Sequence, residues 1–507
     1  MLRRGPVLKN EPRQAPCLAI FGTGSDVGKS VVTTGLCRAL RQQAVKVAPY
    51  KAQNMSNNSG VTPEGLEMGR AQIVQAEAAG IPPHVDMNPI LLKPTSEVGA
   101  QVVLLGQARA NLTALEYHRR KEMLYDAACG ALDRIRSQYE VVLIEGAGSC
   151  AEVNLQAHDI VNFKMAEYAD APVILVADIH RGGVFAQVVG TMACLPPERQ
   201  ERIAGFVINR FRGDLRLFDD GVEWIQTRTG KPVFGVLPWY DHFVIEQEDS
   251  VVIEKPRAVR AENTDLPVIA VIRIPHISNF TDFDPLQALD GVVVHFIEQV
   301  QALDDFKAVI LPGSKNTRHD LEWLHRQGWT DQIRHFSRSG GHVLGICGGY
   351  QMMGRRVSDP EGLEGAPGET PGLGLLLVET VFNAPKTSTR TRFDWHGACG
   401  QGYEIHMGQT VRDGGDGLFT VKERNREAAD DVDGCHLGEG RIAGTYIHGL
   451  FDSPEITRRW LHCWGLSHIG VDTVDGPEAR DRAYDQLAAH VAEHLDLPAI
   501  TGLVQPT

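Results

Sequence analysis

The sequence is short of positive charge. Its 507 residues contain 50 lysines and arginines against 64 aspartates and glutamates, which gives a formal net charge of −14. Such a balance argues against a general nucleic-acid binder and against a protein of membrane surfaces. Any anionic substrate must therefore be met by local lysines and arginines.

The sequence also lacks paired cysteines and long apolar runs. Its 9 cysteines form no CxxC pair, so neither a zinc ribbon nor a disulfide framework is indicated. Residues 1–16 are polar and basic, without the apolar core of a signal peptide, and no later run is long enough to span a bilayer. We expect a cytoplasmic protein with a disordered lead over residues 1–16 and no nucleic-acid or membrane partner; a homo-oligomer is left open.

The first motif of the sequence is an apolar strand that runs into a glycine-rich loop. CLAIFGTGSDVGKS, residues 17–30, has the spacing GxxxxxGK[ST], one residue longer than the common form. Loop amides and the following helix N-terminus can cradle phosphates, Lys29 can reach the terminal ones, and Ser30 can ligate Mg²⁺. The predicted ATP-binding residues are Gly22, Thr23, Gly24, Asp26, Val27, Gly28, Lys29 and Ser30.

Later strands of this half also end in polar residues. YEVVLIEGAGS, residues 139–149, ends in Glu145, which fits the acidic residue that holds Mg²⁺ in P-loop proteins. Residues Glu64–Ala79 have helical periodicity. Because strands alternate with helices, their carboxyl ends share one edge of a parallel, doubly wound sheet. Candidate substrate contacts at this edge are Lys51, Gln53, Asn54, Ser56, Asn57, Asn154 and Asp159, with a solvated loop as the alternative for the first five.

A second strand-turn-helix pattern lies in HVLGICGGYQMMG, residues 342–354. Glycines stand two residues before and two residues after Cys347, as a sharp turn at a nucleophile requires. A cysteine at a helix N-terminus is favoured as thiolate. The alternative is a buried cysteine in a glycine-rich turn.

A thiolate nucleophile needs oxyanion donors and a base. FKAVILPGSKNT, residues 306–317, places Gly313 or Ser314 as one amide donor, and Gly348 supplies the other. RIAGTYIHGLF, residues 441–451, ends a strand in His448, the candidate base.

Cysteine followed by histidine matches the class I, or triad, glutamine amidotransferases, which release ammonia from glutamine through a thioester. Their usual His-Pro-Glu is absent, because His448 is followed by Gly449 and Leu450. We therefore predict a Cys347/His448 dyad and name no residue that orients the histidine. Glu404 and His406 could orient it, contact substrate or make structural hydrogen bonds. His276 and Asn279 either face an interdomain site or belong to a simple capping loop.

The motifs GTGSDVGKS, KAQNMSNNS, IEGAGS, ADIHRGGVFA and VINRFRGD together resemble the cobyric acid synthase family, whose ATPase half is related to dethiobiotin synthetase. The resemblance implies that Asn209 contacts the adenine. It also implies use of ATP, Mg²⁺ and glutamine to amidate a corrinoid, adenosylcobyrinic acid a,c-diamide, at its b, d, e and g carboxylates. This ligase activity would proceed through an acyl phosphate.

The expected fold is α/β, with two doubly wound, mainly parallel-sheet domains. We predict a P-loop ATPase domain over residues 17–253, a linker over 254–266, a class I amidotransferase domain over 267–455 and a C-terminal helical extension over 456–507. Three alternatives stay open: a cobyrinic acid a,c-diamide synthase, a regulatory P-loop ATPase with an inactive amidotransferase module, and a cysteine peptidase. The last leaves the ATPase half without a role.

Overall fold

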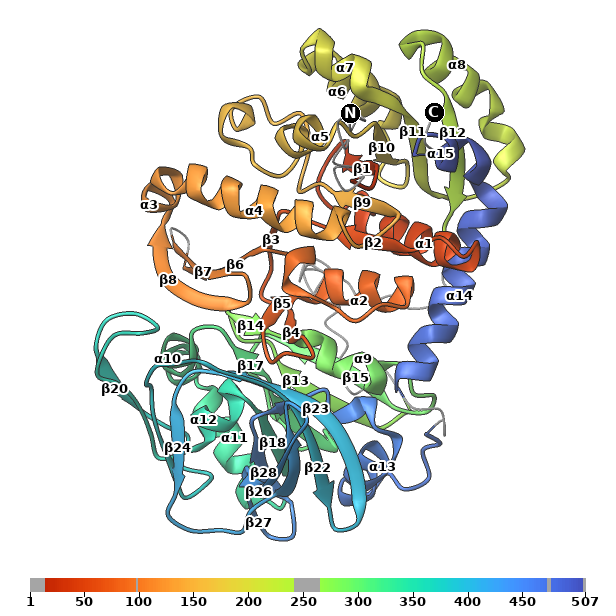
Figure 1. Cartoon of the computed structure of the whole chain (residues 1–507). Helices are drawn as coiled ribbons and strands as arrows, with labels where there is room; N and C mark the ends of the chain where they lie inside the picture. The colour runs from red at the N-terminus through yellow and green to blue at the C-terminus, as the bar shows by residue number, and fades with distance from the viewer. Residues whose placement is uncertain (1–13, 97–98, 241–264, 472–475, 505–507) are drawn as a thin grey trace, which may run out of the picture.

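The computed structural model describes residues 14–96, 99–240, 265–471 and 476–504 (Figure 1). The predicted linker, residues 254–266, lies outside the described residues except at its end, and so does the predicted lead up to residue 13. Ala15 is buried and donates its backbone N–H to the carbonyl of Arg136. The chain forms two α/β domains, each built on a six-stranded sheet, and the predicted fold class is confirmed.

The sheet of the first domain is parallel throughout, with the strand order β12-β11-β10-β1-β9-β2. Alternate residues of β1 enter different cores: Leu18 and Ile20 pack with α1, and Ala19 and Phe21 pack with the helices of the other face. The strands are β1 (Cys17–Gly22), β2 (Val47–Tyr50), β9 (Val141–Glu145), β10 (Val173–Asp178), β11 (Ile203–Phe211) and β12 (Val233–Pro238). The helices are α1 (Lys29–Gln42), α4 (Lys121–Arg136), α5 (Phe163–Ala169), α6 (Val184–Cys194), α7 (Pro197–Arg202) and α8 (Asp219–Thr229).

Between β2 and β9 the chain builds a smaller layer on the side that faces the second domain (Figure 1). It contains a four-stranded sheet of β3 (Gln53–Met55), β6 (Ile90–Ser96), β7 (Gly99–Leu104) and β8 (Gln107–Thr113), followed by α3 (Ala114–Arg119). It also contains an antiparallel hairpin of β4 (Ser59–Val61) and β5 (Glu67–Gly69). The prediction of a helix over Glu64–Ala79 is wrong at its start, because Glu67–Gly69 pair with β4 and α2 covers only Arg70–Ala79.

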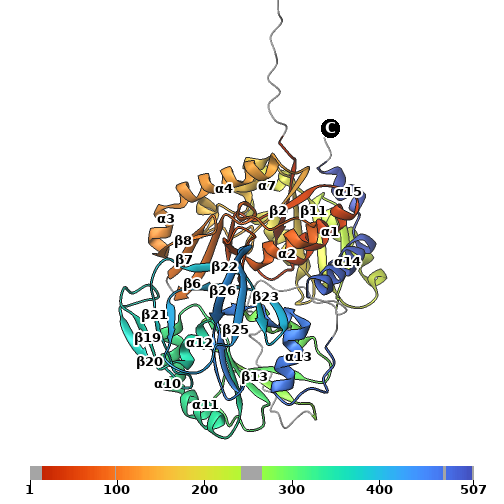
Figure 2. The same cartoon turned by 60° about the horizontal axis from the view of Figure 1, so that its bottom comes forward.

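The sheet of the second domain has the order β15-β13-β16-β18-β28-β27, in which β27 alone is antiparallel to its neighbour. Its strands are β13 (Val268–Ile272), β15 (Val293–Ile297), β16 (Ala308–Leu311), β18 (His342–Ile346), β27 (Cys435–Leu437) and β28 (Ile442–Thr445). Its helices are α9 (Asp284–Gln287), α10 (Thr317–Gln327), α11 (Trp329–Arg338), α12 (Gly348–Met353) and α13 (Pro454–Cys463). Figure 2 shows α10, α11 and α12 on the opposite side of this domain from α13.

Two further sheets extend the second domain. One has the order β20-β19-β21-β24, with β19 (Arg356–Asp359), β20 (Gly368–Pro371), β21 (Val378–Val381) and β24 (Gln409–Arg412). The other has the order β26-β25-β22-β23-β29, with β22 (Thr387–Trp395), β23 (Ala398–His406), β25 (Phe419–Arg424), β26 (Glu427–Asp433) and the short β29 (Ile447–His448). The second of these sheets joins the domain core through Phe393 and Trp395, which pack with Trp460 of α13.

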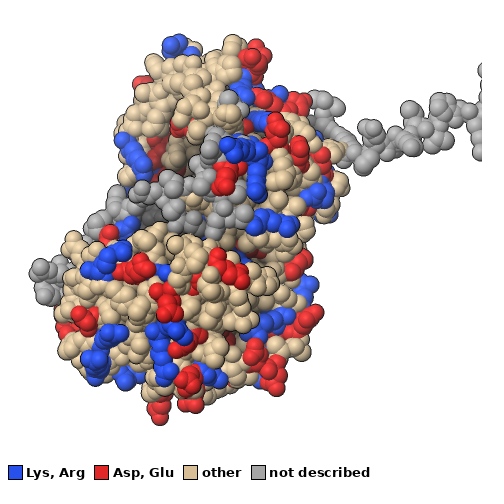
Figure 3. All heavy atoms as spheres, turned by 90° about the vertical axis from the view of Figure 1, so that its left-hand side faces the viewer, with Lys and Arg blue, Asp and Glu red and all other residues tan. Residues whose placement is uncertain are grey.

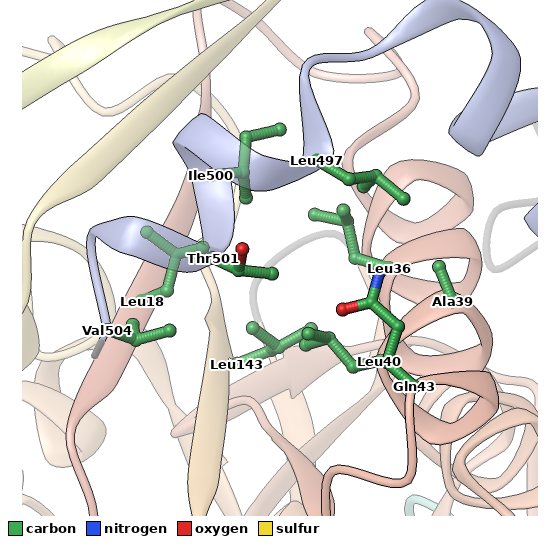
Figure 4. Close-up of a pocket in the computed structure, with 10 residues that line it drawn as sticks. All are labelled: Leu18, Leu36, Ala39, Leu40, Gln43, Leu143, Leu497, Ile500, Thr501 and Val504. Atoms are coloured by element: carbon green, nitrogen blue, oxygen red, sulfur yellow. The ribbon is translucent and has the colours of Figure 1, made fainter.

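The C-terminal helices return to the first domain. α14 (Gly476–His494) packs along α1, and Arg38 of α1 pairs with Asp481 and Asp485 at 2.8 Å. α15 (Leu497–Gly502) covers a small apolar pocket over β1, β9 and α1, whose lining appears in Figure 4. The first domain therefore completes its core with residues of α14 and α15.

One face of the molecule mixes both signs of charge. Acidic and basic side chains are interspersed on the face in Figure 3. Among the described residues no helix combines the length and apolar character that crossing a membrane requires.

Candidate active sites

Cys347 occupies a strained turn between β18 and α12. Its φ of 53° and ψ of −108° lie in a region that residues with a β-carbon rarely adopt. The glycines on either side make the turn possible: a Cβ at Gly349 would stand 2.0 Å from the Leu311 carbonyl oxygen, and one at Gly345 would stand 2.7 Å from the Tyr350 nitrogen. The turn therefore holds the thiol at the carboxyl edge of the sheet, as the sequence pattern predicts.

His448 is the partner of Cys347. It ends β29, is 1% exposed, and lies near enough to Cys347 for the thiol to help raise its pKa, while Cys347 Sγ donates to the Ile405 carbonyl at 3.5 Å. The ring of Tyr403 stacks on it with centroids 5.3 Å apart. The two predicted catalytic residues are thus brought together from segments about a hundred positions apart in the sequence.

Asp282, which the sequence analysis did not identify, orients the histidine. It lies in the short helical turn η6 (Phe280–Phe283) after β13, and its carboxylate accepts a hydrogen bond from His448 Nδ1 at 2.6 Å. The other carboxylate oxygen accepts the backbone N–H of Gly449 at 2.9 Å. Burial would lower the pKa of His448, but the charges of Asp282 and Cys347 and their hydrogen bonds outweigh it and raise the pKa to about 10. Asp282 therefore fills the orienting position that the sequence leaves unnamed beside the predicted Cys347/His448 pair.

Glu404 and His406 pair with each other and with neighbours in the sheet that contains β23. Glu404 accepts hydrogen bonds from Thr391 at 2.7 Å and from Arg424 at 3.0 Å, and its other oxygen lies 3.7 Å from His406 Nε2. Burial would raise the pKa of Glu404, but His406, Arg424 and Thr391 together lower it to about 2. The ring of His406 stacks on Tyr446 with centroids 3.7 Å apart. These contacts favour the structural alternative for both residues.

The predicted oxyanion donors lie together beside Cys347. A Cβ at Gly348 would stand 2.7 Å from the backbone nitrogen of Ser314, and one at Gly313 would stand 3.1 Å from Cε1 of His448. Gly313–Ser314 form β17, which pairs with β14 (Ile277–Ser278). The Ser314 hydroxyl donates to Asp320 at 2.6 Å, which further fixes this segment. The backbone amides of Gly348 and of β17 therefore border the same small space.

The P-loop has the backbone that phosphate binding requires. Gly28, with φ of 94°, precedes the first turn of α1, and a Cβ at Gly22 would stand 2.9 Å from the Gly24 carbonyl oxygen. Lys29 Nζ donates to the carbonyl oxygens of Gly24 at 3.1 Å and Gly148 at 2.9 Å. Strands β10 and β11 and the turn after β10 hold the remaining loop residues. The N–H of Thr23 bonds to Val176, Asp26 pairs with Arg181 and Arg210, and Val27 accepts from Asn209.

Glu145 is the centre of a buried polar cluster at the end of β9. It is 0% exposed, and its Oε1 accepts from Ser30 Oγ at 2.9 Å and from Lys51 Nζ at 3.0 Å. Gln75 of α2 donates to its other oxygen. A hydroxyl and a carboxylate side by side are the hard oxygen ligands that Mg²⁺ prefers, so the residues present fit this ion.

Asn209 lies directly behind the P-loop. Its Nδ2 donates to the Val27 carbonyl at 2.9 Å, and a Cβ at Gly28 would collide with the same nitrogen. Its Oδ1 is buried and has no hydrogen-bond partner within the described part of the chain. A buried unpaired acceptor costs free energy unless a ligand donates to it, which agrees with a base contact.

The substrate candidates are not all brought together. Lys51 donates to Glu145. The other members of the same loop bond elsewhere: Gln53 accepts from Tyr117, and Asn54 donates to Gln72 at 3.1 Å. Ser56 accepts from the N–H of Asn58 at 3.0 Å. Asn57 Oδ1 is buried with no partner in the segments that the structure describes. Asp159 accepts the backbone N–H groups of Val161 and Asn162, and Asn154 is exposed. Lys51 and Asn57 therefore remain the best placed of the set.

Comparison with known protein families divides the chain into the same two domains. Residues 18–251 match the family model described as the CobQ/CobB/MinD/ParA nucleotide binding domain. Residues 268–456 match that of the CobB/CobQ-like glutamine amidotransferase domain.

Curated relatives align along almost the whole chain. The chain is 49% identical over 500 residues to a cobyric acid synthase of Chlorobium phaeobacteroides, covering 96% of this chain and 97% of the relative. It is 50% identical over 493 residues to that of Chlorobaculum tepidum, covering 96% and 98%. It is 45% identical over 507 residues to that of Syntrophobacter fumaroxidans, covering 96% and 98%.

Proposed function

The chain belongs to the cobyric acid synthase family, and from this premise we propose that it amidates adenosylcobyrinic acid a,c-diamide at its b, d, e and g carboxylates. The family consists of glutamine-dependent amide-forming ligases. The observation that carries the proposal is the presence of two complete sets of groups on one chain. Cys347, His448 and Asp282 can release ammonia, and the P-loop with Ser30 and Glu145 can activate a carboxylate.

In the proposed glutaminase reaction, Cys347 Sγ attacks the amide carbon of glutamine. Because Asp282 holds Nδ1 of His448, the opposite ring nitrogen, Nε2, carries the proton taken from the thiol. The raised pKa of His448 keeps the pair as thiolate and imidazolium at neutral pH, and Nε2 gives its proton to the departing ammonia. The N–H groups of Gly348 and of Gly313 or Ser314 stabilise the oxyanion. Water, deprotonated by His448, then hydrolyses the thioester to glutamate and restores the thiol.

In the proposed synthetase reaction, an oxygen of the substrate carboxylate attacks the terminal phosphorus of ATP, and ADP leaves. Lys29 and the loop amides orient the phosphates, and Asn209 Oδ1 accepts from the adenine amino group. Ser30 and Glu145 would hold Mg²⁺, which when bound supplies positive charge to the phosphates. Ammonia attacks the resulting acyl phosphate, an amide bond forms, and inorganic phosphate leaves.

This division of labour assigns ATP to residues 17–253 and glutamine to residues 267–455. Ammonia released at Cys347 would be largely protonated in water, so we include in the proposal a sheltered path from Cys347 to the P-loop edge. The buried polar layer between the domains, which contains Ser59, Glu67 and Lys93, supports such a path.

The test is incubation of the purified protein with ATP, Mg²⁺, glutamine and adenosylcobyrinic acid a,c-diamide. Mass spectrometry should find stepwise conversion of acid groups to amides, with ADP and glutamate formed in step. Conversion of the a and c carboxylates of cobyrinic acid instead would identify the alternative synthase. Binding of ATP without any amide product would identify a regulatory ATPase.

A further inference from the structure

The segment from Ile277 to Phe283 connects the parts of the glutaminase site. At its start, β14 pairs with β17, which carries the predicted oxyanion donors. At its end, η6 carries Asp282, which holds His448 and Gly449. A shift of this segment would therefore move the oxyanion donors and the general base together.

Two reciprocal hydrogen bonds fasten this segment to the first domain. Asn279 Oδ1 accepts the backbone N–H of Ser59 at 3.1 Å, and Asn58 Oδ1 accepts the backbone N–H of Phe280 at 3.2 Å. These residues are buried: Asn58 and Ser59 are 1% exposed, and Asn279 is 3% exposed. Figure 1 shows β14 and the β4–β5 hairpin adjoining at this boundary. Each domain thus supplies one side-chain acceptor for a backbone donor of the other.

Asn279 is suited to this position in two respects. Its φ of 52° is in the left-handed region, which asparagine tolerates better than most residues with a β-carbon. Its short amide reaches across the boundary to Ser59 while the backbone turns into η6. Asp282 follows three positions later and donates its own N–H to the carbonyl of Asn279 at 3.0 Å.

The hairpin that holds Asn279 is itself rigidly placed by Glu67. This buried carboxylate accepts from Ser59 Oγ and Lys93 Nζ at 2.8 Å and from Lys386 Nζ at 2.6 Å. Burial alone would raise its pKa, but Lys386 and Lys93 lower it below the ordinary value, so the group is charged. Lys386 belongs to the second domain, so this ion cluster also ties the hairpin to both halves. Ser59 is therefore a fixed point against which Asn279 can be held.

From these contacts we propose that Asn58 and Asn279 are positioning residues of the glutaminase, which hold the turn carrying Asp282 in register with His448. The inference rests on the proposed roles of Cys347 and His448 in glutamine hydrolysis. It means that the first domain, by supplying Asn58 and Ser59, completes the active site of the second. Neither asparagine touches glutamine in this account, because each acts through Asp282.

The decisive variant is Asn279→Gly in the full chain. Glycine accepts the left-handed backbone, so the substitution removes the side-chain acceptor without straining the turn. We expect kcat for glutamine hydrolysis to fall about tenfold or more, with KM changed less than about twofold. Asn279→Asp keeps an oxygen acceptor for the Ser59 N–H and should restore most of kcat.

Asn58→Ala tests the same turn from the other domain. It should lower kcat to a similar extent, and the double variant should lose less than the product of the two single effects, because both act on one element. The pH profile is the readout that a general loss of stability would not move. When Asp282 no longer fixes His448, the pKa of the histidine falls, so the high-pH limb of the kcat profile should move to lower pH.

The matched control is Asn425→Gly. Asn425 also has a left-handed backbone, with φ of 49°, its Oδ1 accepts the backbone N–H of Arg390 at 2.9 Å, and it abuts Gly65 in the hairpin loop. It does not bond to the η6 turn, so its glycine variant should keep kcat within about twofold. If Asn279→Gly and Asn58→Ala both had the kcat of the wild type and the same high-pH limb of the kcat profile, the inference would be overturned. Retained glutamine hydrolysis in Cys347→Ala would instead overturn the proposed function on which it rests.

Discussion

Nδ1 of His448 lies 2.6 Å from a carboxylate oxygen of Asp282, although the two residues are 166 positions apart in the chain. The carboxylate reaches the histidine from the turn after the first strand of the second domain. In the common His-Pro-Glu arrangement, the acid follows the histidine closely. The same electrostatic role is therefore filled here by a residue from a different element.

Replacement of this acid should impair catalysis more than stability. We expect Asp282→Asn to lower kcat for glutamine hydrolysis on the order of 100-fold or more, because the amide neither fixes the ring nor stabilises the imidazolium. Steady-state glutamate release measures the effect. The control is Asp290→Asn, at an exposed aspartate of the same region, which should leave kcat unchanged. Similar kcat for both variants would contradict the assignment.

Substitutions in the two domains should have different effects on amidation. Cys347→Ala should abolish amidation with glutamine but spare amidation with added ammonium salts, because the nucleophile supplies only ammonia. Lys29→Ala should abolish both, because no carboxylate is activated. Product formation with each nitrogen source is measured by mass spectrometry. Equal loss of both activities in Cys347→Ala would refute the two-site account.

The pairing of His448 should make stability depend on alkaline pH. Its pKa rises from the ordinary 6.5 to about 10 in the folded protein, so the folded state binds the proton more tightly than the unfolded chain. This contribution is fully present below about pH 6.5 and is lost as the pH rises toward about 10. The melting-temperature difference between the wild type and His448→Gln should shrink over that range. A difference independent of pH would contradict the charged pairing.

The unpaired oxygen of Asn209 gives a prediction for nucleotide choice. If Oδ1 accepts from the adenine amino group, Asn209→Ala should raise KM for ATP about tenfold, the worth of one buried hydrogen bond. Because GTP carries an acceptor at the corresponding ring position, the same variant should also discriminate less between ATP and GTP. Initial rates with the two nucleotides test this. A loss that affects both nucleotides equally would show that Asn209 only supports the P-loop through Val27.

Two glycines test the docking of the last helix. A Cβ at Gly35 of α1 would stand 2.6 Å from Val491 Cγ2 of α14, whereas one at Gly190 of α6 would have nothing within 4 Å. Gly35→Ala should therefore destabilise the protein by about 1 to 3 kcal/mol through overpacking. Gly190→Ala should be neutral or stabilising by up to about 1 kcal/mol, because alanine favours a helix. Thermal unfolding compares the two, and equal melting temperatures would mean that α14 does not pack tightly on α1.

The sequence by itself determined two motifs, the turn that carries the nucleophile and the loop that binds phosphate. Cys347 in its turn, Lys29 and Ser30 in the P-loop, and Glu145 at a strand end follow from local requirements: glycines where a side chain would collide, and strands that end at one sheet edge. Such requirements are short in range, so the residues that meet them stand close together in the chain. The order of the two domains follows from the order of these motifs.

Tertiary structure alone decided which residues complete the sites. Asp282 and Asn58 carry no local pattern, because their partners come from segments that meet only after folding. An interdomain position is one of the two alternatives that the sequence leaves for Asn279, but its partner Ser59 is visible only in the fold. The helical periodicity after Glu64 concealed the hairpin that carries Ser59, since β5 pairs with a strand rather than continuing α2. An orienting carboxylate or a cross-domain hydrogen bond needs only an acceptor at the right point in space, and many positions in a sequence can provide one.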